Sequence, residues 1–303
     1  MKIKFLVLFI ADLIFLFSIL IFSTFCSFKI NPPDFSISSA KVFHNCPGSY
    51  LGYQNSSIND VSTFLSFFPN SFENISAYGP SGALPHYSTP PEGSAVIRPC
   101  GLYLVDSGGQ YLTGTTDITR TVPMGPCTEL EREDYTLVLK GMIDLSMAVF
   151  PKGTTGHQLD ALARMPLWRH HRNFGHGTGH GTGYYLCVHE GPQSIRYQYN
   201  PQPLLPGMVT SNEPGLYREG MHGIRHENML LCREAGTSDF GEWLEFETLT
   251  CCHIDTSAVV PELLGPEALG WLNEYNARVY RTLAPLLPSD LASWLQEKTA
   301  PLE

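Results

Sequence analysis

Five side chains of the types that bind metal ions lie between residues 106 and 227 of this 303-residue chain: Asp106, Asp117, His180, Glu213 and Glu227. Four carboxylates packed together would repel one another, and at least one would have to take up a proton. Two divalent cations would cancel that charge, and an oxygen-rich set of ligands with one nitrogen suits manganese. No cysteine pair has the spacing of a structural zinc site. The plainer alternative, that each acid caps a turn or helix, explains any one of these residues better than all five together.

Each of the five residues lies in a glycine-rich or strand-like segment. Asp106 ends the apolar run 103–105 and is separated from Asp117 by a turn at 107–109, which predicts that the two aspartates face each other across a β-hairpin. His180 ends a glycine-rich stretch, and Glu213 precedes a Pro-Gly pair. Glu227 comes directly before the strand-like run 229–231.

The segments around these residues resemble the motif series of the aminopeptidase P family, the Xaa-Pro aminopeptidases. The similar segments are residues 105–111, 114–121, 176–181, 188–192 and 223–228. Their order and spacing match too, and the similarity extends from about residue 74 to the C-terminus. It implies an α+β pita-bread fold, in which two pseudo-symmetric halves form a curved antiparallel sheet with flanking helices. Two metal ions, commonly manganese, would lie in its concave face, with zinc, cobalt and iron as alternatives.

The resemblance also implies a role for each candidate ligand. Asp117 and Glu227 would bridge both metals, Asp106 would complete the shell of one metal, and His180 and Glu213 would complete that of the other. Glu213 would act as the proton acceptor and donor in hydrolysis. The physical reason is that a carboxylate bound through one oxygen keeps its other oxygen within reach of the attacking water.

Three histidines match positions that the family uses outside the metal shell. His86 and His189 resemble residues that line the substrate site and hydrogen-bond the scissile carbonyl or the developing oxyanion, and His176 resembles a residue at the pocket rim. A neutral imidazole can donate a hydrogen bond to an oxyanion without adding net charge to a metal site. We therefore predict Glu213, His189, His86 and His176 as catalytic residues.

The predicted activity is metal-dependent hydrolysis of the bond between an N-terminal residue and a penultimate proline. The predicted substrates are peptides with proline at position 2. A prolidase-type Xaa-Pro dipeptidase is the near alternative, because both enzymes cleave before proline and differ in the length of peptide that they accept. A truncated, catalytically inactive pita-bread protein that serves only for interactions is the alternative from another class.

Composition limits the partners and the compartment. The chain has 29 acidic and 19 basic residues and a formal net charge of −10, which speaks against non-specific binding of nucleic acid. Its eight cysteines show no spacing typical of a disulfide scaffold, so we expect a reduced, cytoplasmic catalytic domain.

The first 75 residues differ from the rest, since 13 of the 17 phenylalanines lie between Phe5 and Phe72. Residues 5–26 are apolar apart from Asp12 and a few hydroxyls, and two lysines precede them, which is typical of a signal-anchor or an uncleaved signal peptide. Membrane contact through this segment is therefore the alternative location. A third interpretation is a non-native extension of a truncated or mis-started enzyme.

We predict four regions along the chain. They are a hydrophobic segment at 1–30, an irregular region at 31–73, a catalytic domain at 74–253 that is incomplete at its N-terminal side, and a C-terminal helical extension at 254–303. The extension has helical spacing over 261–280 and a second helix from Ser289, an N-cap candidate. Its tryptophans and leucines suit core packing or a homodimer contact.

Three further residues need an account. Glu247, in the segment 246–250 that matches a strand of the family, is the alternative to Glu227 as bridging ligand. Asn212 stands where many relatives have Asp, and His226 stands where a β-branched apolar residue is usual. We expect His226 to point away from Glu227, where a buried ring would lack polar partners.

Overall fold

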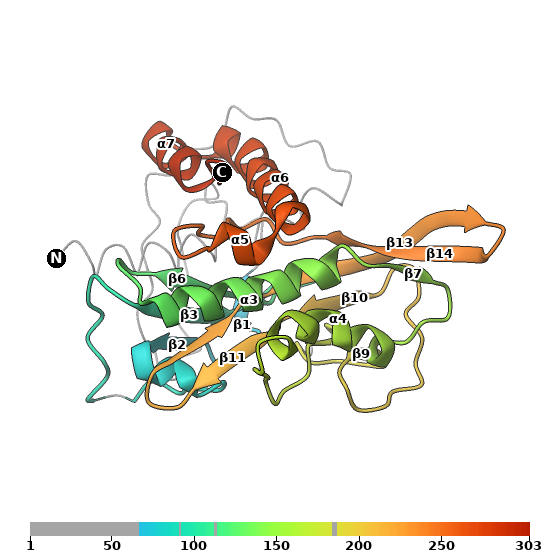
Figure 1. Ribbon diagram of the computed structural model, residues 1–303, viewed down its shortest axis with the longest axis horizontal. Helices are drawn as coiled ribbons and strands as arrows, with labels where there is room; N and C mark the ends of the chain where they lie inside the picture. Colours follow the sequence, from blue (N-terminus) through green and yellow to red (C-terminus); the bar gives the residue numbers. More distant parts are fainter. Residues whose placement is uncertain (1–66, 91, 112–113, 184–186) are drawn as a thin grey trace, which may run out of the picture.

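The computed structural model describes residues 67–90, 92–111, 114–183 and 187–303 of the chain (Figure 1). All strand pairs in this part of the chain are antiparallel, and helices pack beside the sheets. The predicted α+β class is therefore confirmed. The apolar segment 5–26 and most of the region predicted to be irregular lie outside the described residues.

The first sheet has the strand order β2-β3-β6, and a small sheet of order β1-β4-β5 accompanies it. The strands are β1 (Phe67–Asn70), β2 (Ile75–Tyr78), β3 (Leu102–Ser107), β4 (Gly109–Tyr111), β5 (Gly114–Thr115) and β6 (Ile118–Pro123). Asp106 of β3 lies opposite Thr119 of β6, and Asp117 immediately precedes β6. The predicted pairing of the two strands is confirmed, but Asp106 lies opposite Thr119 and not opposite Asp117. In addition, β4 and β5 lie in the connection where we expected a simple turn.

The second half of the sheet system contains a four-stranded sheet of order β10-β13-β14-β7 and two short pairs, β11-β12 and β8-β9. The strands are β7 (Val149–Pro151), β8 (Gly179–His180), β9 (Ser194–Ile195), β10 (Val209–Asn212), β11 (Gly215–Arg218), β12 (His222–Arg225), β13 (Asn228–Ser238) and β14 (Gly241–Thr248). Glu227 lies between β12 and β13, so it directly precedes a strand as predicted.

Helices α3 (Glu129–Ser146) and α4 (Gly156–Trp168) pack against each other beside these sheets (Figure 1). A capping box starts α3: the Thr128 hydroxyl accepts from the Glu131 N–H, and the Glu131 carboxylate accepts from the Thr128 N–H. Gly141 of α3 faces the backbone of α4 so closely that a Cβ there would lie 2.2 Å from the carbonyl oxygen of Ala163. A glycine is therefore needed where the two helices meet.

The C-terminal region folds as α5 (Pro261–Leu264), α6 (Pro266–Leu283), the short 3-10 helix η3 (Ala284–Leu286) and α7 (Ser289–Lys298). Another 3-10 helix, η2 (Gly79–Ala83), follows β2. The helical spacing over 261–280 is borne out except at Gly265, whose φ of 79° separates α5 from α6. The prediction that Ser289 caps the last helix was wrong by one residue. Pro288 is the N-cap and Ser289 is the first helical residue, because proline suits an extended backbone just before a helix.

Arg120 of β6 connects the first sheet to the C-terminal region. Its side chain is buried and donates to Asn228 Oδ1 at 2.8 Å, to the carbonyl of Cys252 at 2.8 Å and to the Tyr275 hydroxyl at 3.0 Å. The surrounding hydrophobic core contains residues of β3, α3, β12 and α6. The C-terminal helices are therefore packed into the same core as the sheet that carries the two aspartates.

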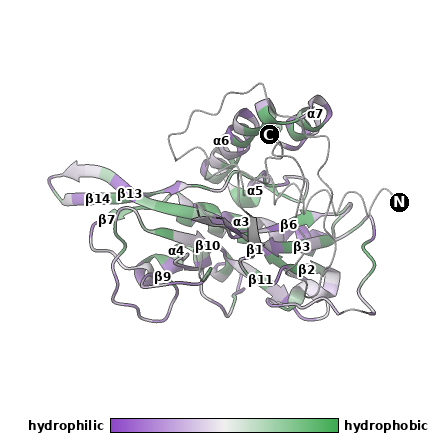
Figure 2. Ribbon diagram, turned by 180° about the vertical axis from the view of Figure 1, so that it is seen from behind, coloured by the Kyte–Doolittle hydropathy of each residue, from purple (hydrophilic) through white to green (hydrophobic). Residues whose placement is uncertain are grey.

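The β13–β14 hairpin extends beyond the rest of the molecule (Figure 1). Residues 229–232 of β13 are apolar and largely buried, whereas residues 233–243 are exposed apart from Trp243, and Figure 2 shows the change in colour along the hairpin. Within the described residues no helix has both the length and the apolar character needed to cross a membrane.

Candidate metal centre

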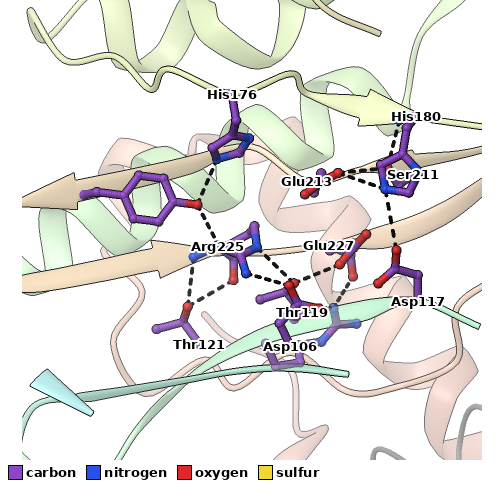
Figure 3. Close-up of polar contacts among 12 residues, drawn as sticks. Asp106, Asp117, Thr119, Thr121, His176, His180, Ser211, Glu213, Arg225 and Glu227 are labelled. Carbon is purple, nitrogen blue, oxygen red and sulfur yellow. Dashed lines mark hydrogen bonds and ion pairs between the residues drawn. The ribbon is translucent and has the colours of Figure 1, made fainter. Parts of the chain in front are cut away.

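Residues from five separate elements converge on one buried site (Figure 3). Asp106 comes from β3, Asp117 from the residue before β6, and His180 from β8. Glu213 follows β10 and Glu227 lies between β12 and β13. Because the first two residues come from one sheet system and the others from the second, the site lies where the two halves meet.

The ligand-type atoms form overlapping groups. One oxygen each of Asp106, Asp117 and Glu227 lie within 4.8 Å of one another, and so do one atom each of His180, Glu213 and Glu227. His180 Nε2 is 3.2 Å from Glu213 Oε1 and 3.5 Å from Asp117 Oδ2. The structure thus brings all five sequence-predicted ligand residues together, and Glu227 belongs to both groups.

One oxygen of two of these carboxylates is held by the protein, while the other is left open. Asp106 Oδ2 accepts from Arg225 Nη2 at 2.6 Å, and Glu227 Oε2 accepts from the Thr119 hydroxyl at 2.8 Å. Asp106 Oδ1 and Glu227 Oε1 are buried and have no hydrogen-bond partner within the described part of the chain. An unpaired buried oxygen is costly, so these two atoms suit a cation.

The ring of His180 has the orientation that a metal ligand needs. Its Nδ1 is 3.0 Å from the carbonyl oxygen of Gly181, so Nδ1 carries the proton of the neutral ring. The lone pair is then on Nε2, which is the atom that faces Asp117 and Glu213. The donor set of oxygens and one imidazole nitrogen therefore fits divalent cations.

The pKa values of the buried carboxylates also favour a site for cations. Burial raises the pKa of Asp117 and of Glu227 well above the ordinary carboxyl value, and repulsion from neighbouring carboxylates adds to this effect. Burial also raises the pKa of Asp106, although the charge and hydrogen bond of Arg225 oppose the rise. Cations bound among these groups would reverse the shifts, because a positive charge stabilises the ionised form.

Glu213 and His180 stabilise each other's charge. Burial alone would raise the pKa of Glu213 and lower that of His180, but their hydrogen bond and opposite charges outweigh it. The pKa of Glu213 is lowered, and that of His180 is raised to about 9. Glu213 is therefore ionised and able to accept a proton, and a cation at His180 Nε2 would compete with the proton there.

The histidines predicted outside the metal shell lie at different places. His189 stacks edge-on against His180 with ring centroids 4.3 Å apart, and one of its ring nitrogens lies within 4.8 Å of atoms of Asp117 and His180. Burial lowers the pKa of His189, and the nearby charges of His180 and His86 lower it further, so its imidazole is neutral. His86 is exposed and lies near His189.

His176 lies on the other side of the site and takes part in a hydrogen-bonded chain. Its Nε2 is 2.8 Å from the Tyr217 hydroxyl. The same hydroxyl accepts a hydrogen bond from Arg225 Nη1 at 2.8 Å. Arg225 in turn binds Asp106 (Figure 3). Burial lowers the pKa of His176. The chain of contacts joins the rim histidine to a ligand of the metal centre.

Sequence reasoning missed four residues that support the ligands: Thr119, Ser211, Tyr217 and Arg225. Three of them could have been found from strand alternation. Arg225 is two residues before Glu227 and Thr119 is two residues after Asp117, so each shares a face with a ligand when the backbone is extended. Ser211, whose hydroxyl accepts from the His180 N–H at 3.0 Å and donates to Glu213 Oε1 at 3.1 Å, has the same relation to Glu213. No short-range pattern indicates Tyr217.

The two departures from the family pattern point away from the centre. Asn212 Nδ2 donates to the carbonyl of Met142 at 2.8 Å and to the Ser146 hydroxyl at 3.0 Å, so it connects β10 to α3. His226 is fully buried, packs edge-on against the Tyr135 ring at 4.4 Å, and has no hydrogen-bond partner for either ring nitrogen within the described residues. The prediction that a buried His226 would lack polar partners is confirmed.

Glu247, the alternative bridging ligand, lies elsewhere. Its Oε2 accepts from Arg233 Nη1 at 2.8 Å on the hairpin, where Arg233 also pairs with Glu245. It belongs to none of the ligand groups found among the described residues.

Comparisons with known proteins agree with this geometry. The profile of metallopeptidase family M24 matches residues 59–234, and that of the C-terminal region of peptidase M24 matches residues 242–302. A probable Xaa-Pro aminopeptidase P of Aspergillus fumigatus is 48% identical over 239 residues, which are 77% of this chain and 36% of that protein.

Two solved structures are similar. The crystal structure of X-prolyl aminopeptidase from Caenorhabditis elegans, described as a cytosolic enzyme with a di-nuclear active site, is 40% identical with a TM-score of 0.75, covering 78% of this chain and 39% of that one. Prolidase from Pyrococcus furiosus is 32% identical with a TM-score of 0.51, covering 60% of this chain and 49% of that one. The chain spans less than half the length of each of these relatives.

Proposed function

The chain belongs to metallopeptidase family M24, and we propose that it carries the catalytic centre of a dinuclear metal-dependent aminopeptidase that cleaves before a penultimate proline. Its fold is the predicted pita-bread fold of that family, with the predicted C-terminal extension. The observation that carries the proposal is the pair of overlapping ligand groups that share Glu227, with Asp106 Oδ1 and Glu227 Oε1 left unpaired.

The names of the relatives support the choice of substrate. The C. elegans protein is an X-prolyl aminopeptidase with a di-nuclear active site, and the A. fumigatus protein is a probable Xaa-Pro aminopeptidase P. By similarity, we propose that this chain acts on peptides whose second residue is proline. The prolidase match makes an Xaa-Pro dipeptidase the second candidate, and peptide length distinguishes the two.

The five ligand residues would hold two divalent metals. Asp117 and Glu227 would contribute to both, Asp106 would complete one, and His180 and Glu213 would complete the other. Manganese is the proposed metal, since four carboxylates and a single imidazole form an oxygen-rich donor set, with zinc, cobalt or iron as alternatives. When bound, such ions polarise the scissile carbonyl and lower the pKa of water.

The residues of the chain itself would supply the proton transfers and the orientation. Ionised Glu213 would accept a proton from the attacking water and return it to the leaving proline nitrogen. Neutral His189, beside His180, would donate a hydrogen bond to the carbonyl oxygen as negative charge develops there. His86 and His176 would bind substrate at the two sides of the site.

Two measurements on purified full-length protein test this function. The first is metal content, for which we expect two equivalents of manganese per chain. The second is hydrolysis of an Xaa-Pro-Xaa tripeptide, for which we expect release of the N-terminal residue only when metal is bound. A chain that binds two metals yet cleaves neither tripeptides nor Xaa-Pro dipeptides would instead support an inactive interaction protein.

The location and assembly of the protein stay predictions. We propose a cytoplasmic enzyme, and membrane contact through residues 5–26 is the alternative. Carbonate extraction of membranes from expressing cells distinguishes them, because an inserted apolar segment resists extraction. Homodimer formation is tested by light scattering of the purified chain.

A further inference from the structure

A buried ion pair on helix α4 holds the segment that leads to His180. Arg164 Nε donates to Asp160 Oδ2 at 2.6 Å, one helical turn away, and each residue is only 1% exposed. Burying two charges costs free energy, and well-packed apolar residues are often as stable in such a position. The directional contacts of the pair are what apolar side chains could not provide.

The contacts of the ion pair hold Phe174, His176 and Thr178, which are alternate residues of the segment before β8. Arg164 Nη1 donates to the carbonyl of Phe174 at 2.7 Å, and Nη2 donates to the carbonyl of His176 at 2.8 Å. The guanidinium also stacks on the Phe174 ring, with its Cζ 3.8 Å from the ring centroid. The free oxygen of Asp160 accepts from the Thr178 hydroxyl at 2.6 Å.

Thr178 connects the ion pair to two residues of one metal group, Glu213 and His180. Its carbonyl accepts from the Glu213 N–H at 2.7 Å, and His180 follows two residues later. Between them, Gly179 lies so close to β10 that a Cβ would be 1.9 Å from the carbonyl oxygen of Ser211. The backbone that presents His180 and Glu213 is therefore held from α4 on one side and from β10 on the other.

The other metal group is joined to the ion pair less directly, through the contacts of His176, Tyr217 and Arg225. Asp106 is held by Arg225, and Glu227 is held by Thr119. Neither Asp160 nor Arg164 has a hydrogen bond to any of these four residues. Disturbing the ion pair should thus affect the two metal positions unequally.

We propose that Asp160 and Arg164 are positioning residues for the metal that His180 and Glu213 bind, and that their loss empties this position before the other. The inference rests on the proposed dinuclear function. Thr178 is the residue through which the pair acts, because its hydroxyl contacts Asp160 and its carbonyl contacts Glu213.

Titration of the full-length protein with manganese ions alone tests the inference. Thr178→Val removes the hydroxyl, retains the shape of the side chain and leaves the Asp160–Arg164 contact in place. We expect one of the two binding steps to weaken by about 10- to 100-fold, the usual effect of losing a group that orients a ligand, while the other step is unchanged. Thr178→Ser restores a hydroxyl and should restore both steps.

Arg164→Met should give the same selective loss, and Arg278→Met is its matched control. Arg278 also donates to two backbone carbonyls, those of Thr248 and Thr250, and lies over the ring of Tyr275, but it does not contact the segment before β8. Arg278→Met should therefore leave both manganese-binding steps unchanged. If Arg164→Met fails to fold, Thr178→Val with its Ser rescue decides the question.

The outcomes separate the inference from the function on which it rests. Selective weakening of one step, with rescue by Thr178→Ser, supports the positioning role. Equal weakening of both steps, or no change in Thr178→Val, would overturn it and leave the dinuclear function intact. A wild-type chain that binds fewer than two manganese ions would refute the dinuclear function itself.

Discussion

Arg225 and Asp106 are joined by a hydrogen bond of 2.6 Å between Nη2 and Oδ2, and both side chains are almost wholly buried. The arginine supplies one fixed positive charge to a site that contains four carboxylates. It holds one oxygen of Asp106, while the other oxygen has no hydrogen-bond partner in the part of the chain that the structure describes. The remaining negative charge is what divalent cations would neutralise.

Arg225→Met should destabilise the metal-depleted protein by about 3–5 kcal/mol, because it leaves a buried carboxylate without its counter-charge. The effect should be smaller with manganese bound, since the cation then pairs with Asp106. Urea denaturation with chelator and with manganese measures both values. Arg233→Met, at an exposed ion pair, is the control and should cost only about 0–1 kcal/mol in either condition. Equal losses for Arg225→Met with and without manganese would contradict the prediction.

Asp117→Asn and Glu227→Gln should each abolish binding of at least one metal, because these carboxylates are proposed to bridge both ions. Asp106→Asn should weaken mainly one position. Manganese per chain after dialysis measures the difference. Glu247→Gln, which alters the carboxylate paired with Arg233, is the control and should retain two equivalents. Two full equivalents in Glu227→Gln would show that the bridging assignment is wrong.

His226→Val should stabilise the fold by about 1–2 kcal/mol, because it removes two buried ring nitrogens that have no hydrogen-bond partner among the described residues. His222→Val is the matched control. His222 is also buried, but its Nε2 is 2.8 Å from Asp134 Oδ2, so its loss should destabilise. Thermal unfolding of both variants provides the measurement. A destabilised His226→Val would mean that packing against Tyr135 outweighs the unpaired nitrogens.

Asp255 should make the C-terminal helices sensitive to acid. Burial alone would raise its pKa, but the charge and hydrogen bond of Lys298 and the contacts of Ser257 outweigh burial and lower it. A lowered folded-state pKa adds stability above the unfolded value of about 3.9, and this stability disappears as the pH falls through the folded value. Wild type should therefore exceed Asp255→Asn in stability at pH 7, and the difference should shrink below about pH 4. A difference that is constant with pH would exclude this role.

Replacing the second residue of a tripeptide substrate should reduce cleavage strongly. Alanine in place of proline changes the scissile bond from a tertiary to a secondary amide and removes the ring that a proline-shaped pocket would contact. Comparison of kcat/KM for Gly-Pro-Ala and Gly-Ala-Ala measures the preference, and Gly-Pro tests the dipeptidase alternative. Equal cleavage of the two tripeptides would indicate an unspecific or methionine-aminopeptidase-like relative.

The convergence of the five candidate ligand residues could be predicted because each lies in a short motif and the motifs together resemble those of one family. The pairing of Asp106 with the start of β6 followed from the turn between them, although the inserted β4–β5 pair did not. Arg225 was within reach of strand alternation. Asp160 and Arg164 were not, because a helix pattern does not reveal which distant segment its buried face contacts. Their role depends on tertiary packing against residues 174–178.

The contacts of Arg120 join the two regions of the chain that the two family profiles match, so the two regions should fold together. Its guanidinium donates hydrogen bonds to Cys252 and Tyr275, in the region that the C-terminal profile matches. It also donates to Asn228, in the region that the M24 profile matches. Removing the C-terminal region would leave the buried Arg120 guanidinium, which lies beside Glu227, without the hydrogen-bond acceptors of Cys252 and Tyr275. This loss would reduce the stability of the remaining fold by several kcal/mol. We therefore expect one calorimetric transition for both parts, so that an inhibitor bound at the metal centre would also protect α6 from proteolysis.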